Sequence, residues 1–183
     1  MDRRVWCGAF LMAVGCRKVA TLPIYGTVPR FQLTTQDGAP FDSHSLDGKL
    51  WLASFFFASC TGPCPRINTQ IYALQESTYT YPDLRILSFT VDPEHDTPPV
   101  LAAYAKRYKA DPQRWTFLTG PRATISKLSK DGFQVGELDD ANSHSTRIML
   151  VDGRSRVRGH YPAIEAESLD ALQKGIASIY QAG

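Results

Sequence analysis

The chain has 183 residues, of which 43% are hydrophobic and 21% are charged. This length suits one domain with its own hydrophobic core, and the composition is that of a globular protein rather than a disordered or fibrous one. Lys and Arg number 20 against 18 for Asp and Glu, and the basic residues are scattered, so we expect no nucleic-acid partner.

Residues 1–21 have the pattern of a targeting or anchoring segment. Two arginines precede an apolar stretch at 5–15, which is too short to cross a membrane by itself. Small residues precede Cys16, as at the cleavage site of a bacterial lipoprotein, although Ala13 stands where leucine is usual. A lipidated Cys16, a simple cleaved signal and an uncleaved anchor all remain open. Each of them places the domain that we expect at 22–183 outside the cytoplasm.

The elements expected after this segment alternate between strands and helices. An alternating stretch at 31–34 with a turn signal at 36–38 predicts a hairpin. The apolar run at 50–57 is typical of a buried strand in a parallel sheet. Further strands are expected at 84–91, 115–118, 147–151 and 157–161, and helices around 67–74, 98–108, 122–130 and 169–179. This order predicts an α/β thioredoxin-like fold, with a central mixed sheet flanked by helices, an N-terminal hairpin extension and an internal insertion.

Cys60 and Cys64 follow the 50–57 strand directly and stand before a helical pattern. The end of a strand and the start of a helix are where α/β folds present reactive groups. Pro65 suits the first turn of the helix, which predicts that Cys64 lies at or near the N-cap rather than within the helix. The helix dipole is expected to favour a thiolate there over a thiol.

Two close thiolates serve disulfide exchange, peroxide reduction or soft-metal binding. The common redox motif has two residues between its cysteines, whereas three separate this pair, and Ala58 stands where peroxide-reducing proteins need a threonine. Two thiolates are too few for structural zinc, but with one imidazole they suit copper. A purely structural disulfide is the remaining alternative, and it would stabilise little because the loop is so short.

A third ligand would come from elsewhere in the chain. The four histidines are His44, His95, His144 and His160, and their spacing alone singles out none of them. His144 lies in a polar loop before the 147–151 strand, which neighbours the cysteine strand in a thioredoxin-like sheet. The loop could therefore reach the two sulfurs.

Four segments, at 60–65, 91–98, 115–120 and 143–152, resemble in their order the motifs of the Sco/SenC family. Members of that family are thioredoxin-like copper chaperones for the assembly of cytochrome c oxidase. The resemblance covers nearly all of 27–180. It implies that Cys60, Cys64 and His144 bind one copper ion per monomer, as Cu(I), Cu(II) or both. The short N-terminal segment differs from the longer membrane helix of many relatives.

Asp92 and Asp96 match the acidic loop of that family. In a functional role, they would orient the histidine ligand or contact a partner. In a local role, Asp92 would form the turn before proline and Asp96 would support the start of the helix. His95, between them, is expected to be a solvated loop residue. The phenylalanines at 55–57 are expected in the core, where they also keep water from the sulfurs.

The resemblance implies a tethered chaperone on the periplasmic side of a bacterial inner membrane. It would deliver copper to the CuA site of the copper-accepting subunit of cytochrome c oxidase, and it would also meet other periplasmic copper carriers. The alternative is an enzyme, a thiol–disulfide oxidoreductase that reduces the cysteines of the recipient. Cys60 would then attack and Cys64 resolve, or the reverse. A redox or copper sensor would use the same residues.

Overall fold

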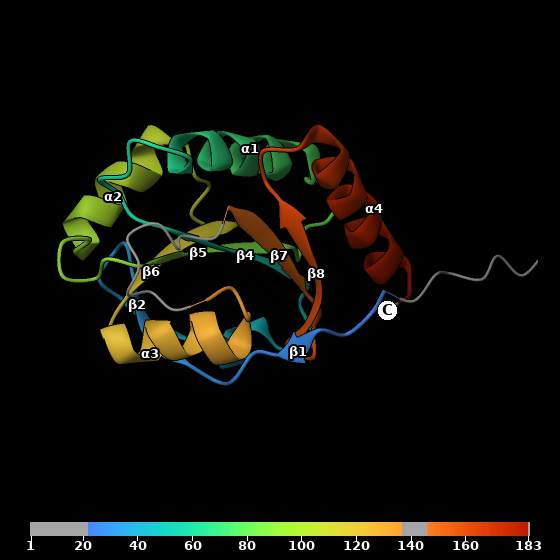
Figure 1. The fold of residues 1–183 in the computed structure, drawn as a ribbon, viewed down its shortest axis with the longest axis horizontal. Coiled ribbons are helices and arrows are strands. Elements are labelled where there is room, and N and C mark those ends of the chain that lie inside the picture. The colour runs from blue at the N-terminus through green and yellow to red at the C-terminus, as the bar shows by residue number, and fades with distance from the viewer. Residues whose placement is uncertain (1–21, 137–145, 183) are drawn as a thin grey trace, which may run out of the picture.

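The computed structural model describes residues 22–136 and 146–182, which form one eight-stranded sheet with helices on both faces (Figure 1). The strand order is β1-β8-β7-β4-β5-β6-β2-β3. The strands are β1 Gly26–Thr27, β2 Gln32–Thr35, β3 Pro40–Asp42, β4 Trp51–Phe56, β5 Arg85–Thr90, β6 Trp115–Thr119, β7 Arg147–Val151 and β8 Arg156–Pro162. The helices are α1 Cys64–Ser77, α2 Pro98–Arg107, α3 Arg122–Lys127 and α4 Ala166–Ala182, with short helical turns η1 Ser43–Leu46 and η2 Leu128–Gly132.

β4 is the central strand of the sheet, as its apolar sequence predicts. All its residues are buried, and it pairs in parallel with β5 and antiparallel with β7. Side chains alternate between the two faces, so Leu52 and Phe56 enter one core while Trp51 and Phe55 enter the other. The strand that leads to the cysteines is thus held on both sides by hydrogen bonds and on both faces by packing.

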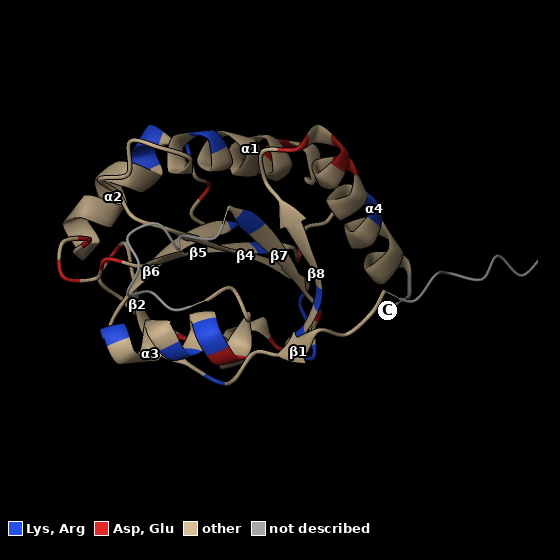
Figure 2. Ribbon diagram, in the orientation of Figure 1, with Lys and Arg blue, Asp and Glu red and all other residues tan. Residues whose placement is uncertain are grey.

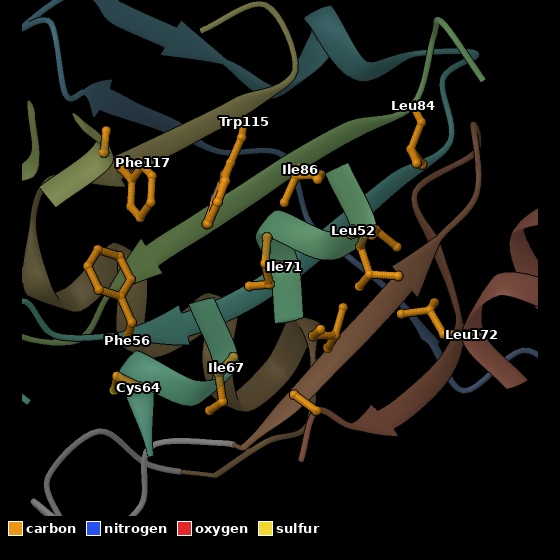
Figure 3. Close-up of a cluster of buried hydrophobic side chains, with 14 of the residues drawn as sticks. Leu52, Phe56, Cys64, Ile67, Ile71, Leu84, Ile86, Trp115, Phe117 and Leu172 are labelled. Atoms are coloured by element: carbon orange, nitrogen blue, oxygen red, sulfur yellow. The ribbon is translucent and has the colours of Figure 1, made fainter. Parts of the chain in front are cut away.

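Two helical layers cover the sheet. Helices α1, α2 and α4 lie on one face and α3 lies on the other (Figure 1). The core under α1 contains Ile67 and Ile71 from that helix, with Trp115 and Phe117 from β6 and Leu172 from α4 (Figure 3). The buried face of α1 includes Ile67, Ile71 and Leu74, which recur at helical spacing.

The predicted hairpin is present as β2 and β3, which pair through Leu33 and Phe41 and extend the sheet beyond β6. The predicted antiparallel pair near the end of the chain is β7 and β8. The parallel strands β4, β5 and β6 all run in one direction, so their carboxyl ends meet at one edge of the sheet. The cysteine loop lies at that edge.

Two helix boundaries differ from the sequence prediction. Helix α1 begins at Cys64 itself, with Pro63 as its N-cap in α conformation, so this cysteine is the first helical residue. Pro65 stands at the second position, where its missing N–H would have no intrahelical acceptor in any case. The helix expected at 122–130 ends at Lys127 and continues as the wider turn η2, which closes at Gly132.

The N-terminal segment predicted at 1–21 lies outside the described residues. Within 22–136 and 146–182, none of the helices combines the length and the apolar character needed to span a bilayer. The first described residues are tied to the sheet, because the guanidinium of Arg158 donates to the backbone oxygens of Leu22 at 2.6 Å and Pro23 at 3.1 Å.

Candidate metal centre

The two cysteines lie together where β4 ends and α1 begins. The backbone N–H of Cys60 donates to the oxygen of Phe57 at 3.2 Å, which closes the turn that follows β4. Both cysteines are free and buried, with exposed fractions of 8% for Cys60 and 1% for Cys64. The two thiols lie close enough for Cys60 to raise the pKa of Cys64. The loop therefore holds two free cysteines, of which Cys60 is the more accessible.

Burial, and to a lesser extent the neighbouring Cys60 thiol, raise the pKa of the Cys64 thiol to about 12. Backbone hydrogen bonds at Phe57 and at Cys64 itself act in the opposite direction but are weaker. The expectation that the start of the helix would favour a thiolate is therefore wrong for Cys64. Desolvation of the charged form outweighs the helix dipole because the sulfur faces the core instead of water.

An apolar floor with one polar pair lies beneath Cys64. Figure 3 shows this cysteine at the amino end of α1, near Phe56 and Ile67. Asn68, one helical turn further along, donates to the Tyr104 hydroxyl at 2.8 Å, and the Tyr104 ring stacks on Phe56 with centroids 5.1 Å apart. The Asn68 Oδ1 atom has no hydrogen-bond partner among the described residues. Sequence reasoning missed this pair, although a polar Asn68 on an apolar helix face was a signal.

Asp96 fixes the start of the cysteine loop. Its side chain is 2% exposed, and its carboxylate accepts the backbone N–H of Ala58 at 3.0 Å and the hydroxyl of Thr90. Burial raises the pKa of Asp96, because neither partner carries a charge. The loop after β5 is thus bonded to the loop after β4, two residues before Cys60.

Asp92 faces the solvent side of the same loop. Its carboxylate lies 2.8 Å from Nδ1 of His95, and this hydrogen bond raises the pKa of the histidine. The His95 side chain is 81% exposed, in keeping with the predicted solvated residue. The structure therefore separates the two acidic residues, since Asp96 contacts the cysteine loop and Asp92 binds its own neighbour.

His144, the third expected ligand, lies outside the described residues. Strand β7 pairs Val151 with Trp51 and Met149 with Ala53, so its first residues lie beside the carboxyl end of β4, where the cysteine loop begins. Within the described ranges, no three His, Cys, Asp or Glu side chains lie close enough together to hold a metal ion. The described histidines, His44, His95 and His160, thus do not join the cysteines in such a group.

The class of protein follows from these features. A mixed sheet with a buried, reduced dithiol between a central strand and the next helix defines a thioredoxin-like protein built for thiol redox chemistry or for soft-metal binding. A sequence profile described as SCO1/SenC matches residues 22–181. The chain belongs to the SCO1/SenC family.

Solved structures of related proteins agree with this assignment. A SCO1/SenC family lipoprotein from Bacillus anthracis is 31% identical, with a TM-score of 0.76 over 90% of this chain and 98% of the other. BsSco, described as a member of the Sco family of cytochrome c oxidase assembly proteins with a disulfide switch, is 28% identical with a TM-score of 0.74, over 84% and 93%. Bradyrhizobium japonicum ScoI with copper bound is 25% identical with a TM-score of 0.65, over 81% and 99%. The predicted thioredoxin-like fold is thereby confirmed.

Proposed function

We propose that this protein binds one copper ion through Cys60, Cys64 and His144 and delivers it to the CuA site of cytochrome c oxidase during assembly. The observation that carries the proposal is the buried pair of reduced thiols at the end of β4. Thiolate sulfur selects Cu(I) over hard cations, and an imidazole suits either copper oxidation state. Copper is the cargo here, so the site has to release it as well as hold it. The copper-bound Bradyrhizobium relative supports this assignment.

Proton release accompanies copper binding in this proposal. Burial keeps Cys64 a neutral thiol at neutral pH, and a metal binds the thiolate, so the Cys64 proton leaves as copper enters. Copper affinity is therefore expected to rise with pH. With only three ligands, the ion can accept a thiolate of the recipient before its first sulfur leaves, whereas a fourth ligand from the same chain would slow the transfer.

The proposed location is the outer side of a bacterial inner membrane. Residues 1–21 would serve as the attachment, through a lipid on Cys16, an uncleaved anchor, or transiently as a cleaved signal. The lipoprotein relative from Bacillus anthracis supports lipid attachment. Arg158 of β8 binds the backbone oxygens of Leu22 and Pro23. The attachment segment would therefore join the domain beside β8.

A second candidate function is reduction of a disulfide in the copper recipient. It is favoured by the two free thiols in one short loop, where Cys60 lies close enough to Cys64 to raise its pKa. Cys60, the more accessible sulfur, would attack as a thiolate and form a mixed disulfide, and one recipient cysteine would leave as a thiolate. Cys64 would then lose its proton and attack Cys60, which releases the second recipient cysteine. Two electrons pass to the recipient, and Cys60 and Cys64 end as a disulfide.

A Cu(I) titration against a competing chelator tests the proposed function. Fully reduced wild-type protein is expected to bind one equivalent, and Cys60→Ala, Cys64→Ala and His144→Ala are each expected to weaken binding more than tenfold, about 1.4 kcal/mol. His95→Ala is the matched control, because its exposed imidazole binds Asp92 and should leave the affinity unchanged. No tight copper in the wild type would refute copper delivery. Disulfide exchange that survives His144→Ala would then leave the reductase as the function.

A further inference from the structure

A groove of about 390 Å³ lies between α1 and α2, directly beside the cysteine loop. It is lined by Pro65, Thr69 and Tyr72 from α1 and by Arg107, Tyr108 and Lys109 from the end of α2. Pro65 is the residue after Cys64, so the groove begins next to the buried dithiol. Neither copper binding nor disulfide exchange, as described above, uses this groove.

Four cations lie on the two helical segments that form the groove. Arg107 and Lys109 line it, and Arg66 and Lys106 are exposed on the same two helical segments. Figure 2 shows basic residues on both α1 and the end of α2, where the two helices approach each other. None of the four takes part in an ion pair between described residues. The six residues that line the groove thus include two cations and no acid.

Helix dipoles account for only part of this charge. Lys106 and Arg107 in the last turn of α2 do offset the negative end of that helix. Arg66, however, lies in the first turn of α1, which holds no acidic residue, and a cation is unfavourable there. The two helices thus bring like charges together against both the dipole of α1 and mutual repulsion. Arg66, which the dipole of its own helix disfavours, and the two cations that line the groove are together typical of a surface that recognises a partner of opposite sign.

Aromatic rings connect the groove to the floor of the dithiol. The Arg107 guanidinium lies 5.6 Å from the centroid of the Tyr108 ring, which keeps this cation over the groove wall. The Tyr108 ring contacts the buried Tyr104 ring at 4.9 Å, and Tyr104 in turn stacks on Phe56 under Cys64. Tyr72 lines the groove together with Tyr108. An apolar side chain can therefore pack between two tyrosines while carboxylates bind the cations.

We propose that this groove docks an acidic, extended segment of the protein that receives copper or electrons from this chain. Carboxylates of the segment pair with Arg107 and Lys109, and a side chain between them packs against Tyr72 and Tyr108. The partner's cysteines are thereby brought to Cys60 and Cys64 before any sulfur is exchanged. The identity of the partner rests on the proposed function, whereas the acidic character of the segment rests on the groove alone.

The docking chemistry is tested with a synthetic hexaglutamate peptide, added at low salt to the reduced full-length chain and followed by backbone amide chemical shifts. We expect shifts centred on 65–72 and 106–109, and none with hexaglutamine. The double variant Arg107→Glu/Lys109→Glu should lose them. Lys127→Glu/Lys174→Glu, which changes two exposed cations outside the groove, should keep them. If the reversal disturbs the fold, Arg107→Gln/Lys109→Gln replaces it, with the same loss expected.

Shifts centred elsewhere, or a response that survives both groove variants, would overturn the proposal. So would the absence of any hexaglutamate response at low salt. The copper titration is run in parallel on Arg107→Glu/Lys109→Glu, where an unchanged affinity is expected. If the wild type binds no copper but binds hexaglutamate in the groove, the proposed function fails while the docking site remains.

A second readout uses the soluble copper-accepting domain of cytochrome c oxidase as the partner. The rate constant for copper transfer should fall about tenfold in Arg107→Glu/Lys109→Glu at low salt, and the salt dependence seen in the wild type should disappear. Hexaglutamate should compete with transfer by the wild type. Equal rates for the wild type and the groove variant at every salt concentration would contradict a role for the groove in delivery.

Discussion

Asp96 and Asp152 are two buried carboxylates at opposite ends of β4, and their environments shift their pKa values in opposite directions. Asp96 is 2% exposed beside the cysteine loop, and Asp152 is 4% exposed in the turn after β7. Burial raises the pKa of Asp96, whose hydrogen bonds to Thr90 and Ala58 do not compensate for it. Burial also pushes the pKa of Asp152 up, but hydrogen bonds from Arg156, Arg158 and the backbone outweigh it and lower the pKa.

The difference shows that the hydrogen-bond partners of a buried acid decide in which direction its pKa shifts. At the end of β4 far from the cysteines, Arg156 and Arg158 form an ionic cluster with Asp152. Arg158 also donates to the backbone oxygen of Leu22, one of the first described residues. The cysteine end has neutral hydrogen bonds to Asp96 and a neutral thiol at Cys64. One end is thus held by ion pairs, and at the other end Cys64 stays a neutral thiol until a metal or a partner thiol arrives.

The largest loss of stability is expected from removing Asp152, the carboxylate that pairs with Arg156 and Arg158. Asp152→Ala should lower the free energy of unfolding by roughly 3 kcal/mol, because it leaves two arginines without their carboxylate, and the Arg158 side chain is only 12% exposed. Urea denaturation measures this loss. The control is Asp47→Ala, which breaks an exposed pair with Arg30 and should cost far less, because solvent screens that pair. Equal losses for the two variants would contradict the contrast.

A smaller loss of stability is expected at the cysteine end. Asp96→Ala should cost about 1–3 kcal/mol, since it leaves the Ala58 N–H and the Thr90 hydroxyl without their acceptor. It should also speed alkylation of Cys60, because the cysteine loop loses the hydrogen bond from the Ala58 N–H to Asp96 in the loop after β5. Asp92→Ala, which removes only the contact with His95, is the control and should leave the alkylation rate unchanged. Unfolding curves and thiol alkylation with mass detection measure both effects, and similar alkylation rates in the two variants would refute this role of Asp96.

The smallest effects are expected in the pH dependence of stability, with opposite signs for the two acids. A raised pKa means that Asp96 contributes stability below its unfolded pKa near 3.8, and this is lost as pH rises through the folded value. A lowered pKa means that Asp152 contributes stability above pH 3.8, and this is lost as pH falls through the folded value. Relative to the wild type, Asp96→Asn should gain stability as pH rises and Asp152→Asn should lose it. Denaturation curves from pH 3 to 7 measure both, and slopes of the same sign would contradict the account.

Much of the fold could be predicted from local sequence patterns. The run at 50–57, the hairpin signal at 36–38 and the helical spacing of Ile67 and Ile71 each depend on periodicity and turn chemistry, which neighbouring residues determine. The helix boundary at Cys64 could not be predicted in this way. Pro63 takes an α conformation as the N-cap, so α1 begins one residue earlier than Pro65 alone suggests.

The site could be predicted in its residues but not in its electrostatics. The spacing of Cys60 and Cys64 after a strand predicts a dithiol, yet the neutral state of Cys64 also depends on burial in a cluster with Tyr104, which is remote in sequence. The contact of Asp96 with Ala58 is likewise a tertiary one. From the sequence alone, Asp92 and Asp96 had the same two possible roles. Tertiary packing decides these features.

Copper K-edge X-ray absorption on the reduced full-length chain loaded with one equivalent of Cu(I) tests the central claim most directly. Two sulfur ligands and one nitrogen ligand per copper are expected from Cys60, Cys64 and His144. His144→Ala should lose the nitrogen and keep both sulfurs, whereas His95→Ala should leave the spectrum unchanged. A copper ion with no sulfur ligand, or a nitrogen contribution that survives His144→Ala, would contradict the proposed site.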